Sequence, residues 1–188
     1  DDLETSAEAV SAIIANRIIP ATLEFLDQQT VRVVEDFAQI GLPTDVGAVM
    51  LIEQDGPPEV VERDMARIEE ICRLTNAVDV RVAKTEAEAD ALTSARRTAL
   101  SALSRVKPTT ILEDATVPRS KIAEMVRAIE AIAEKYQLTI CTFGHAGDGN
   151  LHPTCLTDAR NLEEMALVEK AFDEICHKAI ELGVTIPG

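Results

Sequence analysis

Short apolar runs recur along the chain and predict strands. A strand is expected wherever such a run is too short for a helix and is bounded by turn residues, at 21–27, 46–54, 109–117, 138–144 and 151–156. A further strand is predicted at 78–82, where Val78, Val80 and Val82 alternate with Asp79 and Arg81, the pattern of a strand with one buried face. Residues 184–188 begin like another strand.

Between these runs, apolar residues recur every three or four positions and predict amphipathic helices. The helices are expected at 5–16, 30–40, 119–136 and 161–182, after the turn at 55–58, and after Thr85, which forms a capping-box pattern with Glu88. Strands and helices therefore alternate, except for one β-β step near residue 148. This order favours a parallel α/β sheet, but it also fits a ferredoxin-like α+β arrangement, which uses βαβ units too.

Composition and charge restrict the possible partners. The chain has 188 residues and a formal net charge of −15, so it repels nucleic-acid phosphates and anionic lipid surfaces. No apolar run approaches the roughly 20 residues of a membrane-spanning helix. The four cysteines form no Cys-x-x-Cys pair and suggest reduced thiols in the cytosol. We predict no nucleic-acid partner and a cytoplasmic location.

The segment around residue 148 contains two of the three histidines. Asp148 and Gly149 lie between two apolar runs, which is a strong hairpin signal. With these two residues as the turn, His145 and His152 stand directly opposite each other on one face, at a spacing that suits two ligands of one metal ion. The same spacing is compatible with two solvated polar residues. A metal-dependent hydrolase would need a third ligand, and none is obvious nearby.

Two further residue sets attract attention. Arg96 shares a helix face with Leu92, Ala99 and Leu103, whereas Arg97 is expected to point away. A guanidinium on an apolar face either pairs with an internal carboxylate, for which Asp114 is a candidate, or binds a substrate carboxylate. In the predicted hairpin, Cys141 and Cys155 point to opposite faces, so we expect two core thiols and no disulfide between them.

The segment Gly-His-Ala-Gly-Asp-Gly-Asn-Leu-His-Pro at 144–153 resembles a motif of the C-terminal domain of FAD-linked oxidases. That family includes bacterial glycolate oxidase, whose FAD subunit is the nearest likeness, D-lactate dehydrogenases and D-2-hydroxyglutarate dehydrogenase. Supporting matches are spread over the chain, at Ile18-Ile19-Pro20, Leu23-Glu24, Arg96 and Asp114-Ala115-Thr116-Val117-Pro118. The resemblance implies an α+β fold with a mostly antiparallel sheet covered by amphipathic helices.

The resemblance also implies site residues. His145 and His152 would bind a divalent metal such as zinc, Arg96 and Thr154 the substrate, and Asn150 the cofactor FAD. The third metal ligand and the general base are expected in a Glu-His-Gly tripeptide beyond Gly188, so no catalytic base is expected among these residues. The chain departs from relatives at three positions that bear on the substrate, namely Thr93, Leu112 and Thr154.

The activity implied is hydride transfer from the α-carbon of a small 2-hydroxy acid to FAD. Residues 1–188 would then be a single substrate-binding cap domain excised from a larger flavoenzyme. Its own FAD domain and other oxidase subunits would be its partners, and any association of the cytoplasmic protein with a membrane would be made through those subunits. The alternative is a stand-alone metal-binding or interaction module without catalytic activity.

Overall fold

A computed structural model of the protein describes residues 2–183. The helices and strands follow one another as α1 (Asp2–Ala15), β1 (Thr22–Asp27), α2 (Gln28–Ala38), β2 (Ala48–Glu53), α3 (Pro58–Leu74), α4 (Glu86–Val106), β3 (Thr109–Leu112), β4 (Ala115–Thr116), the 3₁₀ turn η1 (Arg119–Lys121), α5 (Ile122–Tyr136), β5 (Thr139–His145), β6 (Asn150–Thr157) and α6 (Leu162–Glu181). The strand expected to begin at residue 184 lies outside the described residues.

All these strands belong to one sheet, and every paired neighbour is antiparallel. The order is β2-β1-β5-β6-β3, and β4 pairs with the beginning of β6. Because β3 and β5 are each antiparallel to β6 between them, they run parallel to each other, and α5 connects them. This is a split βαβ unit of the ferredoxin-like kind. The mostly antiparallel α+β fold is confirmed, and the parallel α/β alternative is wrong.

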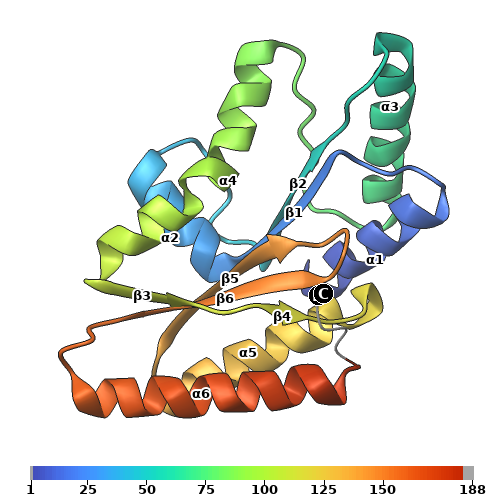
Figure 1. Ribbon diagram of the computed structural model, residues 1–188. Coiled ribbons are helices and arrows are strands. Elements are labelled where there is room, and N and C mark those ends of the chain that lie inside the picture. The colour runs from blue at the N-terminus through green and yellow to red at the C-terminus, as the bar shows by residue number, and fades with distance from the viewer. Residues whose placement is uncertain (1, 184–188) are drawn as a thin grey trace.

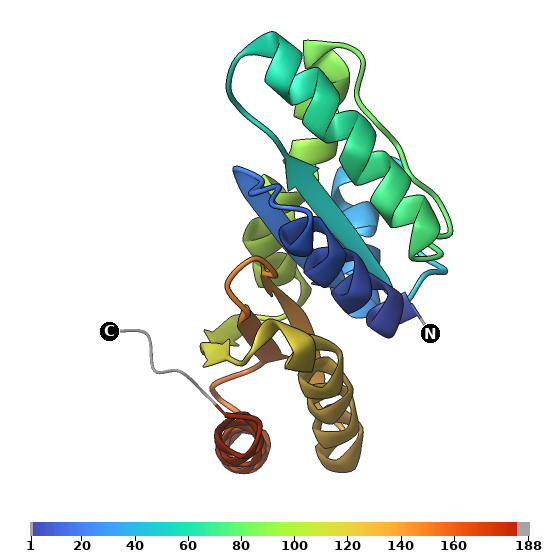
Figure 2. The ribbon, with the colours of Figure 1, turned by 90° about the vertical axis from the view of Figure 1, so that its right-hand side faces the viewer.

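Helices cover both faces of this sheet (Figure 1). One face packs against α5 and α6, and the large core there includes Phe25, Met125, Ile129 and Leu151. The other face packs against α2 and α4. Figure 2 shows α1 lying against the sheet between α3 and α5, and both helices contact it.

Side-chain caps fix where several helices begin. Asp27 accepts a hydrogen bond from the Thr30 backbone N–H at 2.7 Å, which starts α2 directly after β1. The predicted capping box at the start of α4 is confirmed, because Thr85 accepts from the Glu88 N–H and Glu88 accepts from the Lys84 N–H.

The predicted strand at 78–82 is wrong. These residues have no strand pairing in the described chain, and Val78 is 79% exposed. Val80 instead packs against the small core between α1 and α3. Arg81 anchors the segment through hydrogen bonds that it donates to the Gly41 carbonyl at 3.0 Å and to the Asp79 carboxylate at 2.8 Å. The alternation of apolar and polar residues thus reflects packing over α3 rather than pairing in a sheet.

The predicted strand at 109–117 is divided into β3 and β4. The interruption at Glu113 and Asp114 stands opposite Pro153 of β6 in the register of these strands. Proline has no N–H to donate to the strand ladder, which weakens pairing at that point. The break leaves the Asp114 side chain beside His152.

The cysteines behave as the sequence predicts. Cys141 and Cys155 are buried and free, and they point to opposite faces of the sheet. Burial raises the pKa of the Cys155 thiol to about 11, so it stays protonated at neutral pH. Among residues 2–183, no helix is both long enough and apolar enough to cross a bilayer.

Candidate functional site

The two motif histidines lie on adjacent strands and face the side of the sheet that carries α2 and α4. His145 stands opposite Asn150, and His152 stands opposite Phe143, so the predicted direct pairing of the histidines is wrong. The register differs from the prediction by two residues. Side chains alternate with a period of two along a strand, so both histidines still share a face. Their ring centroids are 5.2 Å apart, with the rings nearly perpendicular.

The register differs because the loop between β5 and β6 has four residues, 146–149, rather than two. The Ala146 N–H donates to the Leu23 carbonyl at 2.9 Å, so β1 holds the residue that would have continued the hairpin. Gly149 has a φ of +80°, and a Cβ there would lie 2.0 Å from the Val117 carbonyl oxygen. Glycine is therefore required at Gly149 both for its backbone angle and for this close approach.

A buried carboxylate holds the first histidine. Glu24 of β1 is directly across the strand from His145, and its Oε1 lies 2.6 Å from Nδ1 of that ring. The same oxygen lies 2.9 Å from Nε of Arg96 on α4. The predicted internal partner of Arg96, Asp114, is therefore wrong. The Glu24 side chain is only 6% exposed, so the pair with Arg96 compensates a charge that burial would otherwise make costly.

The second histidine has a carboxylate partner of its own. Oδ1 of Asp114 lies 2.6 Å from Nδ1 of His152. The two partners differ in exposure, because the Asp114 side chain is 54% exposed and the Glu24 side chain is buried. The ring of His152 also contacts that of Phe143, with centroids 5.5 Å apart.

These contacts bear on whether the histidines suit a metal. A carboxylate only accepts hydrogen bonds, so Nδ1 of each ring carries a proton and Nε2 is the nitrogen available for a ligand. Metal-binding histidines typically donate their other ring N–H to a carboxylate in this way. His145 and His152 therefore fit as two metal ligands. Within residues 2–183, no group of three or more His, Cys, Asp or Glu side chains is arranged to hold a metal ion.

The two remaining predicted residues lie on the same face of β6. The Asn150 side chain is half-buried, and its Oδ1 accepts from the Thr116 hydroxyl at 3.1 Å. Thr154 is fully buried, and its hydroxyl donates to the His152 carbonyl at 3.0 Å. Their roles toward cofactor and substrate stay predictions.

The histidines and Arg96 border a cavity of about 240 Å³. It is lined by residues of β1, α4 and the β5–β6 hairpin, namely Glu24, Phe25, Leu26, Arg96, Arg97, Ala99, Phe143, His145 and His152. Arg97 is also among these lining residues, but its side chain is 57% exposed and its Nη2 donates to the Asp90 carbonyl, as expected for a residue that points away from the apolar face. Two histidines and two arginines therefore border one cavity.

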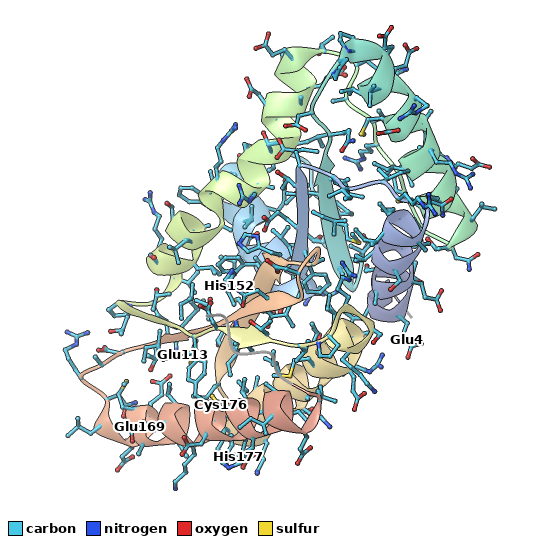
Figure 3. All side chains as sticks on the ribbon, turned by 45° about the vertical axis from the view of Figure 1, so that its right-hand side comes forward. Glu4, Glu113, His152, Glu169, Cys176 and His177 are labelled. Carbon is cyan, nitrogen blue, oxygen red and sulfur yellow. The ribbon has the colours of Figure 1, made fainter. Side chains whose placement is uncertain are left out.

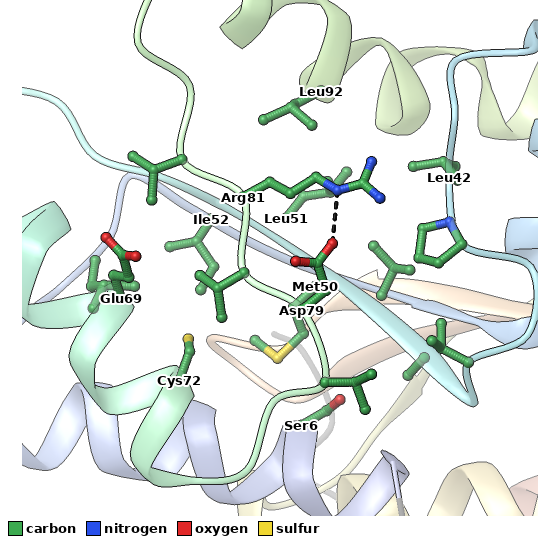
Figure 4. A pocket seen from close by; sticks show the side chains of 18 of the residues that line it. Ser6, Leu42, Met50, Leu51, Ile52, Glu69, Cys72, Asp79, Arg81 and Leu92 are labelled. Carbon is green, nitrogen blue, oxygen red and sulfur yellow. Dashed lines mark hydrogen bonds and ion pairs between the residues drawn. The ribbon is translucent and has the colours of Figure 1, made fainter.

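A second hollow of the same size lies between β2, α3 and the segment 78–82 (Figure 4). Its wall is mostly apolar and includes Met50, Ile52, Met65, Ile68 and Val80. It presents no histidine, and its arginine, Arg81, is paired with Asp79.

The third histidine is far from either hollow. Figure 3 shows His177 on α6, on the opposite side of the sheet from His152. Its Nδ1 lies 2.7 Å from the Asp173 carbonyl of the same helix.

Sequence reasoning missed the roles of three residues at the site. Glu24 is one of two charged residues, with Asp27, in an otherwise largely apolar strand, and that pattern could have marked it. Asp114 was assigned to Arg96 rather than to His152. Arg97 carries no local signal, because helical periodicity places it away from the apolar face.

Comparison with known proteins decides the family. All of residues 1–188 match the family model described as "FAD linked oxidases, C-terminal domain". The chain belongs to this family. The resemblance at 144–153 is therefore confirmed over the whole chain.

Curated relatives match the whole length of the chain. The chain is 68% identical over its whole length to the glycolate oxidase subunit GlcD of Bacillus subtilis, of which it covers 40%. It is 37% identical to the subunit of the same name from Escherichia coli K12, covering 38% of it. It is 30% identical to a D-lactate dehydrogenase of Anaerostipes hadrus, covering 41% of it. The chain thus spans about two fifths of the length of these relatives.

Solved structures agree on the fold. An alkyldihydroxyacetonephosphate synthase superposes on 97% of this chain with a TM-score of 0.66 at 12% identity, and the match covers 38% of that chain. A p-cresol methylhydroxylase superposes on 90% of this chain with a TM-score of 0.56 at 14% identity, and the match covers 40% of that chain.

Proposed function

We propose that this chain is the substrate-binding cap domain of a longer FAD-dependent oxidoreductase. The reaction is oxidation of a small 2-hydroxy acid, of the glycolate or D-lactate class, by transfer of the α-hydrogen as a hydride to FAD. The observation that carries the proposal is the cavity in which Arg96 and Arg97 lie beside His145 and His152. The names of the relatives support this substrate class.

The residues of this chain bind and orient the substrate. Arg96 binds the substrate carboxylate through guanidinium donors that its Nε contact with Glu24 does not use. Fixing the carboxylate fixes the α-carbon relative to the flavin, which converts binding energy into orientation. Thr154 and Asn150 are proposed as further contacts to substrate and FAD.

His145 and His152 border the cavity and are the residues that would hold a divalent metal. When bound, such a metal supplies Lewis-acid polarisation of the hydroxyl, and FAD supplies the hydride acceptor. Glu24 and Asp114 keep the proton of each imidazole on Nδ1, so both Nε2 atoms stay available on the cavity side. None of the 188 residues is proposed as the general base.

The proposal extends to the setting of the whole protein. Residues 1–188 are one domain, and an N-terminal domain holds most of the FAD. The relatives named as glycolate oxidase subunits support further subunits as partners. We propose a cytoplasmic location, with any membrane association made through those subunits.

The test compares His145→Ala with His177→Ala in the full-length flavoprotein. His145→Ala removes a proposed ligand, so metal content and turnover of glycolate or D-lactate should fall together. His177→Ala removes a histidine that is exposed on α6 and should change neither. Normal metal content and normal turnover in His145→Ala would refute the role given to this histidine.

A further inference from the structure

The two arginines of the cavity differ in how far their charges are already balanced. Arg96 makes an ion pair with Glu24, whose side chain is 6% exposed and also holds His145. An incoming carboxylate therefore meets Arg96 as half of a neutral pair. Binding of the carboxylate at Arg96 gains oriented hydrogen bonds but little net electrostatic attraction.

Arg97 is only loosely engaged. Its Nη2 donates to the Asp90 carbonyl at 3.1 Å and lies 3.7 Å from the Asp90 carboxylate. Both side chains are more than half exposed, at 57% and 71%, so water screens this pair. Asp90 does not line the cavity, whereas Arg97 does. The Arg97 side chain extends toward the N-terminal end of α4, where Asp90 lies two helical turns away.

The charge of the whole chain makes this difference matter. A net charge of −15 repels an anionic substrate at long range. Among the groups that line the cavity, Glu24 offsets Arg96, and Arg97 is the remaining cation. A carboxylate that enters the cavity is therefore drawn by Arg97 before Arg96 orients it.

On the basis of the proposed function, we propose that Arg97 is a second substrate-binding residue, which exchanges its loose contact with Asp90 for the carboxylate of the 2-hydroxy acid. Asp90 is then a competitor that holds the Arg97 guanidinium when no substrate is present. A guanidinium has five N–H donors, and the hydrogen bond to the Asp90 carbonyl uses one of those of Arg97, so donors remain for a carboxylate.

The test uses the full-length flavoenzyme and two measurements. One is the steady-state oxidation of glycolate and D-lactate. The other is binding of 2-hydroxyisobutyrate, followed through the flavin absorbance. This probe keeps the hydroxyl and the carboxylate but has no α-hydrogen, so it binds without being oxidised.

Arg97→Gln keeps most of the side-chain length and removes the charge. At low ionic strength it should raise KM and the Kd of the probe by about tenfold, the effect of losing one charge-assisted contact. Added salt should reduce the difference in KM and Kd between Arg97→Gln and wild type, because the attraction between Arg97 and the carboxylate acts through solvent. The kcat should change less than about twofold, since uniform binding affects KM alone.

Three further variants complete the design. Arg97→Lys keeps the charge, so its KM and Kd should stay within about threefold of wild type. If Arg97→Gln acted by disrupting the fold, this restoration by lysine would not be expected. Asp90→Asn removes the competitor and should lower KM by about twofold. Arg105→Gln is the matched control, because Arg105 is an exposed arginine at the other end of the same helix, over Phe37, and should behave as wild type.

Two results would overturn the inference in distinguishable ways. If wild type binds the probe and Arg96→Gln weakens binding, but Arg97→Gln matches wild type, the role of Arg97 is wrong and the proposed function stands. If wild type neither oxidises the two acids nor binds the probe, the proposed function itself fails.

Discussion

Two of the hollows formed by the described residues have volumes of about 240 Å³ each, and they differ in what lines them. The one between β2 and α3 is walled mostly by apolar side chains, with the Arg81–Asp79 ion pair and two glutamates also among its lining residues. The other, beside the β5–β6 hairpin, is walled by two arginines, two histidines and a buried glutamate. Volume alone does not distinguish them. Placing charged groups around a cavity has a desolvation cost, so their presence there supports the binding role that we propose for it.

The charged cavity also draws on distant parts of the chain. Glu24 comes from β1, Arg96 from α4 and His145 from β5, and the three meet at one carboxylate oxygen. The apolar hollow is formed by packing, and the segment 78–82 is held over it by the hydrogen bonds of Arg81 to Asp79 and to the Gly41 carbonyl. The difference predicts that substitutions in the apolar hollow change stability, whereas those in the charged cavity change binding and turnover.

The largest effect is expected in the apolar hollow. Ile68 lies in its wall and is 3% exposed, so Ile68→Ala should lower the free energy of unfolding by roughly 2–5 kcal/mol through lost burial and a larger cavity. Denaturant unfolding of the full-length protein measures this, while kcat and KM for glycolate should be unchanged. Leu74→Ala, 70% exposed on the same helix, is the control. A tenfold rise in KM for Ile68→Ala would erase the distinction between the hollows.

The next effect concerns a buried carboxylate outside both hollows. Asp27 accepts hydrogen bonds from the Thr30 and Thr142 backbone N–H groups, at 2.7 Å each. Burial raises its pKa from 3.8 to about 6, against the lowering effect of these hydrogen bonds. The folded state therefore binds the proton more tightly than the unfolded state. Its contribution to stability is full below pH 3.8 and decreases as the pH rises through 6.

Urea unfolding of wild type and Asp27→Asn at several pH values tests this. Between pH 4 and pH 7, the stability of wild type relative to the variant should fall by roughly 2 kcal/mol. A difference that stays constant with pH would show that Asp27 titrates normally. Either way, Asp27 differs from Glu24 in having backbone donors rather than cations, which makes it a residue of the fold and not of the site.

The sequence predicted the fold more fully than the site. The faces of helices such as α5, with Met125 and Ile129 inward, follow from local periodicity and are confirmed. The segment 78–82 was misassigned because alternation reports a buried face and not the element that buries it. Val80 packs over α3, which no local pattern reveals, whereas Val78 is exposed.

At the site, the sequence indicated residues but not their contacts. His145 and His152 were placed on one face, although the loop is longer because Ala146 bonds to β1. The partner of Arg96 was missed because Glu24 is 72 positions away in the chain, and such a contact depends on how β1 and α4 meet in space. The hydrophobic periodicity of each element carries no information about how β1 and α4 pack against each other.

The smallest effects are expected from Glu24 and Asp114, the carboxylates that contact the two histidines. Their comparison shows how much each carboxylate contributes to turnover. Glu24→Gln removes the charge that holds both His145 and Arg96, so kcat should fall by about tenfold, or about 1.4 kcal/mol, the usual scale for a residue that orients a metal ligand. Asp114→Asn should lower kcat by only about threefold, because the Asp114 side chain is 54% exposed and water can replace its contact to His152. Metal content and single-turnover flavin reduction in the full-length enzyme measure both. Equal losses in the two variants would mean that burial of the carboxylate does not matter to how a histidine is held, and that the charged cavity is organised by its hydrogen bonds alone.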